Sequence, residues 1–342
     1  MGGSAFSFRF LRALACVAAG AVLLAGSSSA DVSPIAFQGP APGSVLTVEA
    51  GKKITFSVSA AVGTVPTAVL KLKVTKLPRG ASFRVRGGNP ATAVFSWRPR
   101  GPQIGDRTIT VAAQAAALPR ATLPLTIHVV PGYTQLTTPN ADGSHWAYVA
   151  VPAAVRAAPW AHSSVVGRIG LWTPENYPNL VTLLEQRTLK SGSWVHVRFP
   201  KLPNNTTGWV KRGALGSFHA LTTHLVVNRA TTTLTLYKAG AVAFRTRVGV
   251  GQRRWPTPRG EFYITERLTG FHNAAYGPIA FGTSARSSVL TDWPGGGFVG
   301  IHGTDAPGLI PGHISHGCIR VRNAAILRLA RMLPVGTPLS IQ

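Results

Sequence analysis

The chain contains few cysteines. Only two of its 342 residues are cysteine, and Cys16 lies in an apolar run near the N-terminus, so Cys318 stands alone in the remainder. A single cysteine cannot form an internal disulfide, and an isolated thiol in an oxidising compartment is prone to damage. Chemistry at Cys318 is therefore the leading explanation for its presence.

Long apolar runs are missing beyond the first thirty residues. There, Arg9 and Arg12 precede an uncharged apolar run at 13–26, and the small residues at 28–30 follow. This is the charged, apolar, small-residue order of a secretory signal. An uncleaved membrane anchor is the alternative, although spanning a bilayer takes ~20 apolar residues. We therefore expect residues 1–30 to be a signal peptide and the remainder to be exported and extracytoplasmic.

Acidic residues are scarce as well. The chain has 10 Asp and Glu against 35 Lys and Arg, a net charge of +25. Such a charge attracts polyanions, which outside a cell are anionic wall polymers or lipid headgroups. An export signal argues against nucleic acid. The arginines are spread through every region, so genomic composition bias explains the charge equally well.

Proline and glycine are abundant instead. The chain has 26 prolines and 37 glycines, with only 13% charged residues. Many turns between short strands are typical of β-rich proteins, and 342 residues exceed one ordinary domain. We predict a mainly β, multidomain fold with no long helices.

Residues 31–131 alternate apolar and polar side chains in short runs. The segments 54–58, 107–111 and 125–129 each place apolar side chains on one face, and turns at 78–80 and 86–90 separate such runs. Several strands at this spacing predict a β-sandwich. The stretches 93–99 and 105–111 resemble bacterial immunoglobulin-like modules, which implies a spacer or adhesive role without catalytic residues.

A linker at 137–143 leads to a second module, expected at 145–216. Residues 194–199 alternate cleanly, a polar turn follows at Asn204-Asn205, and then comes Gly208-Trp209-Val210. This order resembles bacterial SH3-like wall-binding domains, which implies a small barrel. Residues 204–207 also match a glycosylation acceptor, which we interpret as an ordinary turn.

The C-terminal region, 222–342, is predicted to be a third domain. A hairpin is expected at 234–244 around Ala239-Gly240, with further strands at 261–264 and 298–301. Helical spacing at 323–333 puts four apolar side chains on one face, ahead of Pro334. We predict a β-domain with one short C-terminal helix.

Reactive side chains concentrate in seventeen residues of this region: His302, His313, Ser315, His316 and Cys318. A thiol of ordinary pKa, ~8.5, is only a few per cent thiolate at neutral pH. A neighbouring imidazole can take its proton. Glycines at 300, 303 and 317 permit close backbone approach, and the amides of Gly317 and Cys318 would form an oxyanion hole. These are the parts of a cysteine acyl-transfer site.

These segments resemble the YkuD-type L,D-transpeptidase family. Residues 300–304 read Gly-Ile-His-Gly-Thr and 315–320 read Ser-His-Gly-Cys-Ile-Arg, which matches the family's histidine, gap and Ser/Thr-His-Gly-Cys pattern. Residues 257–262 look like its Thr-Pro-x-Gly-x-Phe stretch, and 335–338 like its closing strand. The resemblance covers about 225–342.

The resemblance implies a role for each matching residue. Cys318 would be the nucleophile that attacks a peptidoglycan stem tetrapeptide and releases D-alanine, with His302 as general base. Ser315 and His316 would orient that imidazole, and Arg320 would hold a substrate carboxylate. An amine of a second stem would then take the acyl group, which gives a 3→3 cross-link. Sensitivity to carbapenems is also implied, whereas no cofactor and no metal are.

Substrate-contacting residues are harder to predict. Tyr276 and Gly303 are our candidates for substrate binding. Aromatic side chains at loop edges, such as Trp255, Trp293 and Tyr276, either line a groove or anchor packing. Because we take the modules before residue 217 to be spacers or wall-binding units, we expect chemistry on soluble fragments to be independent of them.

Other functions stay open. Water in place of the second amine would make the enzyme an L,D-carboxypeptidase. Four residues could ligate zinc: His302, His313, His316 and Cys318. Cys318 could also be a small buried side chain, or the chain a non-catalytic wall-binding relative.

Overall fold

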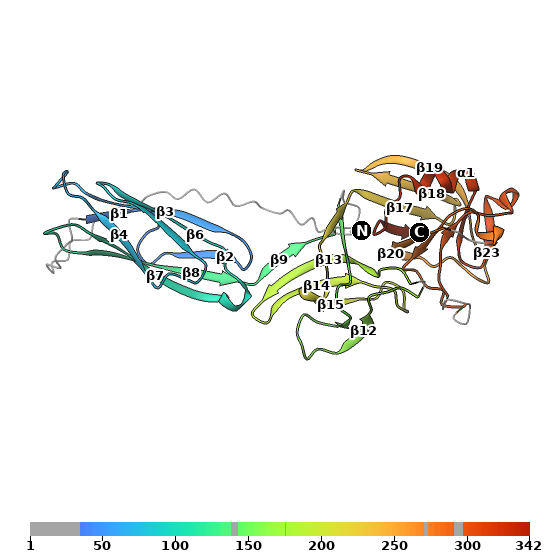
Figure 1. The fold of residues 1–342 in the computed structure, drawn as a ribbon, viewed down its shortest axis with the longest axis horizontal. Helices are drawn as coiled ribbons and strands as arrows, with labels where there is room; N and C mark the ends of the chain where they lie inside the picture. Colours follow the sequence, from blue (N-terminus) through green and yellow to red (C-terminus); the bar gives the residue numbers. More distant parts are fainter. Residues whose placement is uncertain (1–34, 138–142, 175, 270–272, 291–296) are drawn as a thin grey trace, which may run out of the picture.

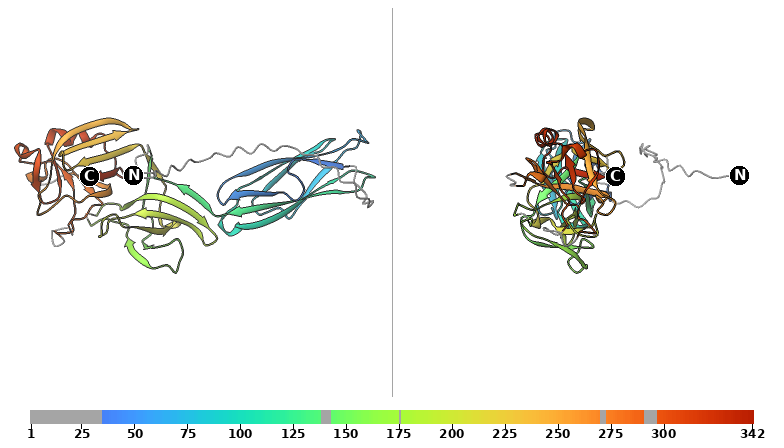
Figure 2. Two further views of the ribbon diagram at one scale, coloured as in Figure 1. Left: turned by 180° about the vertical axis from the view of Figure 1, so that it is seen from behind. Right: turned by 90° about the vertical axis from the view of Figure 1, so that its right-hand side faces the viewer.

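The computed structural model describes residues 35–137, 143–174, 176–269, 273–290 and 297–342, in three parts that lie in a row (Figures 1 and 2). The predicted signal peptide, Cys16 and Trp293 lie outside these residues. Within them, no helix is long and apolar enough to cross a membrane.

The first part consists of two four-stranded sheets, in the orders β1-β3-β6-β5 and β2-β8-β7-β4. Alternate side chains of both sheets meet in one apolar core that includes Phe95 and Trp97 from one sheet and Ile109 and Leu125 from the other. The predicted two-sheet sandwich is therefore present, while the likeness to immunoglobulin modules stays a prediction. The elements are β1 (Ile35–Gln38), β2 (Val45–Glu49), β3 (Ile54–Val62), β4 (Lys71–Thr75), β5 (Ser82–Arg86), β6 (Ala91–Trp97), η1 (Gly101–Gln103), β7 (Gly105–Gln114) and β8 (Ala121–Val130).

The middle part is a sheet in the order β12-β11-β15-β14-β13-β10-β16, to which β9 adds beside β13. It spans 132–221 and so extends beyond the expected 145–216 at both ends, because β9 and β16 pair with its strands. The SH3-like likeness stays a prediction. Its elements are β9 (Gly132–Gln135), β10 (Ser144–Tyr148), β11 (Ala153–Arg156), β12 (Val165–Ile169), β13 (Leu180–Leu189), β14 (Gly192–Arg198), β15 (Thr207–Lys211), η2 (Arg212–Ala214) and β16 (His219–Leu221).

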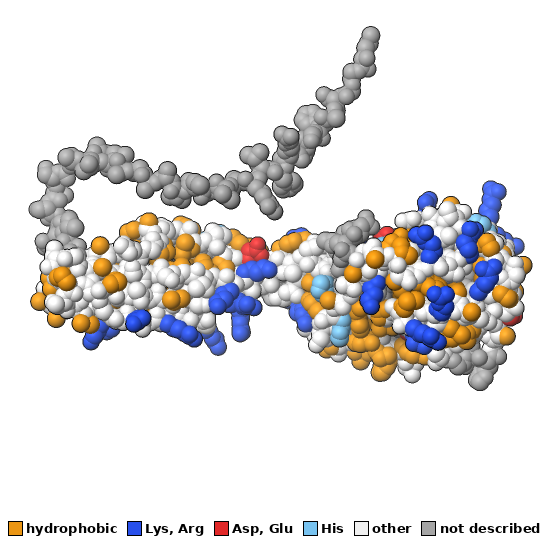
Figure 3. Space-filling model, turned by 90° about the horizontal axis from the view of Figure 1, so that it is seen from above, with side chains coloured by type: hydrophobic (Ala, Val, Ile, Leu, Met, Phe, Trp, Pro, Cys, Tyr) orange, Lys and Arg blue, Asp and Glu red, His pale blue; other side chains and the backbone are white. Residues whose placement is uncertain are grey.

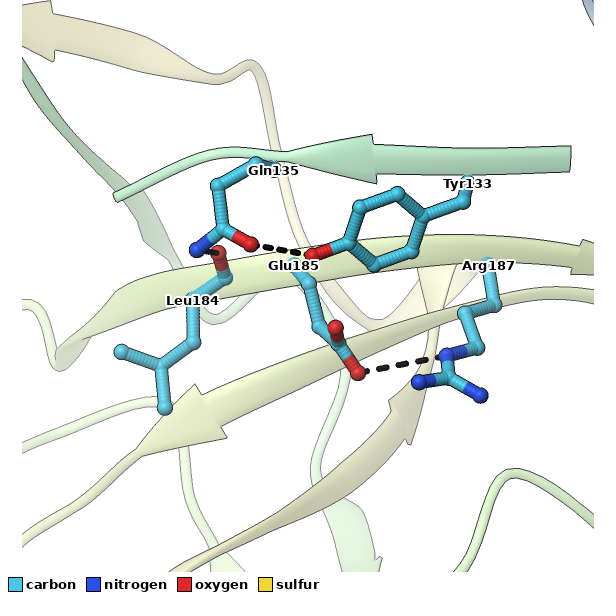
Figure 4. Close-up of polar contacts among 5 residues, drawn as sticks. All are labelled: Tyr133, Gln135, Leu184, Glu185 and Arg187. Atoms are coloured by element: carbon cyan, nitrogen blue, oxygen red, sulfur yellow. Dashed lines mark hydrogen bonds and ion pairs between the residues drawn. The ribbon is translucent and has the colours of Figure 1, made fainter. Parts of the chain in front are cut away.

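Strand β9 joins the sandwich to the middle sheet, and side chains support its pairing with β13 (Figure 4). The Tyr133 hydroxyl donates to Oε1 of Gln135, whose Nε2 donates to the Leu184 carbonyl at 3.2 Å. Beside them, Arg187 Nε donates to Glu185 Oε1 at 3.2 Å. Backbone pairing and side-chain hydrogen bonds thus hold the same short strand.

The C-terminal part is a sheet that closes on itself. Its order is β18-β17-β25-β20-β21-β22-β24-β19-β23, and β18 also pairs with β19. Strand β19 is long enough to pair with β18 through 241–247 and with β24 through 248–249. The strands are β17 (Thr223–Asn228), β18 (Thr233–Lys238), β19 (Ala241–Gly251), β20 (Gly260–Leu268), β21 (Ala280–Thr283), β22 (Ile301–His302), β23 (Gly312–Ser315), β24 (Ile319–Val321) and β25 (Pro338–Ile341).

One α-helix is found among the described residues, and it packs on this closed sheet. Helix α1 (Asn323–Ala330) buries Ile326, Leu329 and Ala330 in the core of the closed sheet, and Leu333 beyond its end is buried as well. The predicted apolar face is confirmed, although the helix ends before residue 333. Two 3₁₀ turns, η3 (Ala274–Tyr276) and η4 (Pro307–Leu309), lie in loops. The predicted strand at 298–301 is wrong in all but its last residue, since β22 begins only at Ile301.

The middle sheet and the closed sheet share a small apolar cluster. Trp146 and Leu180 of the middle sheet pack with Tyr263 of β20, which is fully buried. The Tyr263 hydroxyl donates to the Leu180 carbonyl at 3.1 Å. A polar group buried between two domains is costly unless it is paired, so this bond holds the domains in register.

Replacing Tyr263 by Phe should lower the free energy of unfolding by about 1–2 kcal/mol, because a buried carbonyl loses its donor. Urea denaturation followed by tryptophan fluorescence measures the change. Tyr148→Phe is the matched control: its ring also contacts Trp146, but it is 38% exposed and has no such bond. An equal effect of both substitutions would contradict the role of the buried bond.

Candidate active site

The register of two parallel strands brings the reactive residues together. Strands β22 and β24 pair His302 with Arg320, and the Ile319 amide donates to the Gly300 carbonyl at 2.8 Å. Alternate residues of a strand point to the same face, so Cys318 and Arg320 share the face on which His302 lies. Residues sixteen or more positions apart in sequence therefore become neighbours.

A cavity of about 300 Å³ opens over this face. Six residues expected from the sequence line it: Tyr276, His302, Ser315, His316, Cys318 and Arg320. The remaining lining residues are ones that the sequence did not point to. Asn273 and Ala275 lie at η3 beside Tyr276, and the others lie in the segments around Arg286 and Phe298: Ser287, Leu290, Gly297 and Phe298. The sequence motif thus forms one side of a pocket whose other side could not be predicted from it.

The His302 imidazole is held in one tautomer. Its Nδ1 donates to the Gly303 carbonyl at 2.6 Å, which leaves Nε2 unprotonated and able to accept a proton. Burial lowers the pKa of His302 to about 4, the bond to Gly303 opposes that shift, and the charge of Arg320 adds to it. His302 is therefore a neutral base at physiological pH.

Cys318 sits at the end of a tight turn, with its sulfur facing a backbone amide. The Gly300 N–H donates to Sγ at 3.5 Å. Burial raises the pKa of the Cys318 thiol, and the Gly300 amide and Arg320 offset only part of that effect. Both shifts favour the neutral forms of the two side chains, a thiol and an imidazole, over a thiolate and an imidazolium.

Ser315 holds this turn and does not contact the His302 ring through any hydrogen bond seen here. Its hydroxyl donates to the Cys318 carbonyl at 2.5 Å and accepts from the Gly317 amide at 3.1 Å. The Ser315 hydroxyl therefore does not orient His302, whose ring bonds to the Gly303 carbonyl; the expected roles of Ser315 and His316, partly through backbone groups, stay predictions. The Gly317 half of the expected oxyanion hole is wrong, because that amide hydrogen already has an acceptor. Of the two amides expected to form the oxyanion hole, only that of Cys318 remains as a candidate donor.

Thr257 is a residue of the site that sequence reasoning missed. The side chain is 1% exposed. Its hydroxyl accepts a hydrogen bond from the Gly251 amide and donates one to the Gly317 carbonyl, both at 2.8 Å. The carbonyl and amide of one trans peptide point in opposite directions, so Thr257 also sets the direction of the Cys318 N–H. Gly317 takes φ +115°, a conformation that favours glycine. The available signal was the Thr-Pro-x-Gly stretch itself.

Two aromatic rings flank the reactive pair. Tyr276 lies with its ring centroid 5.0 Å from that of His302, and Trp255 lies 4.1 Å from that of His316. The sequence left open whether Tyr276 lines a groove or anchors packing. It does both, because it lines the cavity and its ring packs on His302. Trp255 instead packs behind His316.

Gly303 does not line the cavity, and its polar groups are used within the protein. Its amide donates to the Ile279 carbonyl at 3.2 Å, and its carbonyl accepts from His302. The expectation of substrate binding at Gly303 is thus wrong. Arg320 does line the cavity, and its buried Nε has no acceptor among the described residues. An acceptor supplied by a substrate would satisfy it.

The four side chains considered as alternative zinc ligands do not converge. Among the described residues, no three His, Cys, Asp or Glu side chains are placed to share one metal ion. His313 is exposed, and its Nδ1 lies 3.2 Å from the Gly251 carbonyl. The arrangement matches proton transfer between a thiol and an imidazole, which is the chemistry of cysteine acyltransferases.

Comparison with known proteins places this site in a family. The profile of the YkuD L,D-transpeptidase catalytic domain matches residues 222–341. YqjB of Bacillus subtilis is 30% identical over 122 residues, which cover 33% of this chain and 68% of that protein. The chain belongs to the L,D-transpeptidase family, and residues 222–341 are its catalytic domain.

Two further relatives match over the same region. YkuD of Bacillus subtilis is 35% identical over 118 residues, or 34% of this chain and 65% of that protein. YkuD of Bacillus licheniformis is 37% identical over 109 residues, or 32% and 59%. The chain thus spans slightly less than two thirds of the length of these two proteins.

Similar solved structures also carry the L,D-transpeptidase name. The catalytic domain of the Enterococcus faecium enzyme acylated by ertapenem is 28% identical, covers 36% of this chain and 99% of that chain, and has a TM-score of 0.25. The enzyme from Mycobacterium smegmatis is 14% identical, covers 91% of this chain and 99% of that chain, and has a TM-score of 0.27.

The neutral resting pair predicts the pH dependence of thiol reactivity. Because the pKa of Cys318 is raised, its alkylation by iodoacetamide should climb steadily through neutral pH and level off only above the midpoint of a free thiol, ~8.5. Rates are measured by intact mass in a Cys16→Ser background, where Cys318 is the only thiol. A plateau beginning near pH ~5, the mark of a thiolate–imidazolium pair, would contradict this assignment.

Proposed function

We propose that the protein is a peptidoglycan L,D-transpeptidase whose nucleophile is Cys318. The observation that carries the proposal is the single pocket in which Cys318, a neutral His302 and the buried Nε of Arg320 meet. Nucleophile, base and a cationic hydrogen-bond donor are the groups that acyl transfer to and from a carboxylate-bearing peptide needs.

The first half-reaction is acylation. Cys318 Sγ attacks the carbonyl between the diamino acid and the terminal D-alanine of a stem tetrapeptide, while its proton moves to Nε2 of His302. The carbonyl oxygen gains negative charge and accepts from the Cys318 amide. The C–N bond then breaks, His302 returns the proton to the leaving nitrogen, and D-alanine departs, which leaves a thioester on Cys318.

The second half-reaction transfers the acyl group. The side-chain amine of a second stem attacks the thioester, and His302 accepts the proton that this amine loses. The C–S bond breaks, the thiol is reprotonated, and a 3→3 cross-link is released. Water in place of the amine gives the L,D-carboxypeptidase reaction, so the two outcomes differ only in the acceptor.

We also propose that the protein is exported and works in the cell wall. The order of charged, apolar and small residues at 9–30 supports export, with an uncleaved anchor as the alternative. Lys and Arg side chains are spread over the sandwich and the catalytic domain, with few acidic ones on the face seen in Figure 3. A surface of this sign attracts anionic wall polymers.

Incubation with the carbapenem ertapenem tests the nucleophile. The wild-type protein should gain the mass of one inhibitor molecule, because Cys318 attacks the β-lactam carbonyl as it attacks a peptide. Cys318→Ala should gain none, and both proteins are followed by intact mass. A folded wild-type protein that gains no adduct would instead favour the non-catalytic alternative.

Replacing Thr257 by Val tests the oxyanion donor. Without the hydroxyl, the Gly317 carbonyl loses its donor and the Cys318 amide its fixed direction, so acylation by ertapenem should slow by about 10²-fold. Thr257→Ser keeps the hydroxyl and should acylate near the wild-type rate. Equal rates for Val and Ser variants would mean that Thr257 does not act on this amide.

A further inference from the structure

The turn at Asn204-Asn205 belongs to the middle domain but contacts the catalytic domain. Asn204 Nδ2 donates to the Arg286 carbonyl at 2.7 Å, and the Arg286 amide donates to Asn204 Oδ1 at 3.0 Å. One side-chain amide thus pairs with both backbone groups of one residue 82 positions away. From the sequence alone this turn had no assigned role.

The Asn204 side chain forms the hydrogen bonds to Arg286 that a neighbouring strand would otherwise form. Residues 285–287 pair with 297–299: Ser287 N donates to the Gly297 carbonyl at 2.7 Å, and Val299 N donates to the Ala285 carbonyl at 3.3 Å. Arg286 lies opposite Phe298 in this bridge, so its own N–H and C=O point to the other side. There the Asn204 amide meets them, because its C=O and NH₂ have the spacing of a peptide group.

The segment that Asn204 holds is a wall of the catalytic pocket. Ser287 and Phe298 line the same cavity as Cys318. The Arg286 guanidinium lies 3.5 Å from the Phe298 ring centroid and donates to the carbonyls of Thr283 and Ala285, both at 3.1 Å. The backbone of Arg286 is fixed by Asn204, and its side chain in turn fixes Phe298.

The same wall continues to the nucleophile. Two residues after Phe298, the Gly300 amide donates to Cys318 Sγ, and the Gly300 carbonyl accepts from Ile319. Because residues 285–287 pair with 297–299, a displacement of the first segment also moves the second, and with it the surface of the pocket. Even a small displacement of a group that positions a substrate lowers the reaction rate strongly.

We infer that Asn204 of the middle domain is a positioning residue for the active site, and that it sets the place of the Arg286–Phe298 wall. The inference rests on the proposed function, because its consequence is the fit of the donor peptide or inhibitor opposite Cys318. It also argues against our expectation that chemistry is independent of residues before 217.

Asn205 provides a matched comparison within the same turn. Its Oδ1 accepts from the Glu261 amide at 2.7 Å, and its side chain lies against Gly260, at the start of β20. Both asparagines therefore bridge the two domains with hydrogen bonds of similar length. Only Asn204 bonds to the segment that walls the pocket, so loss of interdomain contact in general and loss of pocket geometry can be told apart.

The experiment compares Asn204→Ala, Asn204→Asp and Asn205→Ala in the full chain. Asn204→Ala should lower the second-order rate constant of acylation by ertapenem by about tenfold or more. The change should lie mainly in the ertapenem concentration that gives half the maximal rate, rather than in the maximal rate itself. Asn204→Asp should lose as much, because a carboxylate oxygen would face the Arg286 carbonyl in place of a donor. Asn205→Ala should stay within about twofold of the wild type.

Alkylation of Cys318 by iodoacetamide serves as the second readout. This reagent is small and needs no substrate pocket, so in Asn204→Ala and Asn204→Asp its rate should change far less than acylation by ertapenem, and Asn205→Ala should react at the wild-type rate. An Asn204→Ala protein that acylates as fast as the wild type would overturn the inference. So would equal acylation losses in Asn204→Ala and Asn205→Ala, which would mean that the two asparagines only stabilise the interface.

Hydrogen exchange separates this inference from the proposed function. Asn204→Ala should speed exchange at Arg286 and in the paired arms 285–287 and 297–299, whereas Asn205→Ala should speed it at Glu261. Unchanged exchange at 285–287 in Asn204→Ala would sink the positioning role even if the enzyme is active. Faster exchange there, in a protein that never forms an ertapenem adduct, would instead overturn the transpeptidase proposal alone.

Discussion

The parallel pairing of β22 with β24 is the constraint on which the active site depends. It sets His302 beside Arg320 and brings Gly300 to Cys318, so one register places His302, Arg320 and Cys318 on one face. A shift of one residue would turn Cys318 and Arg320 to the opposite face of the sheet, since side chains alternate with period two. The many strands of the closed sheet serve to hold this one short pairing in place.

Burial and hydrogen bonding have separate effects on His302 and Cys318: burial shifts their pKa values, and hydrogen bonds orient them. Burial disfavours charge on both partners, lowering the pKa of His302 and raising that of Cys318. The backbone groups then supply direction: Gly303 selects the tautomer of the imidazole, and Gly300 faces the sulfur. A thiol that stays protonated is less readily oxidised than a thiolate, so this arrangement limits damage to a solitary cysteine.

The turn before the nucleophile and the turn in the middle domain follow the same principle. In each, one polar side chain forms hydrogen bonds with two backbone groups: Thr257 with the Gly251 amide and the Gly317 carbonyl, and Asn204 with both groups of Arg286. Buried backbone groups must be paired, so these side chains determine where the loops lie. The middle domain in this sense contacts a segment next to the pocket without lining the pocket itself.

Much of the molecule follows from local sequence. Strand alternation and turn residues were enough to predict a mainly β protein, the two-sheet first part and the apolar face of α1, because these patterns depend only on neighbours in the chain. The spacing of His302 and Cys318 pointed to acyl-transfer chemistry for the same reason. Contacts between distant segments were a different matter. The acceptor of His302, the occupied amide of Gly317, the bridge of Thr257 and the reach of Asn204 all depend on backbone groups whose direction arises only when the sheets pair. Backbone groups are identical at nearly every position of a sequence, so only the folded chain decides which of them a side chain meets.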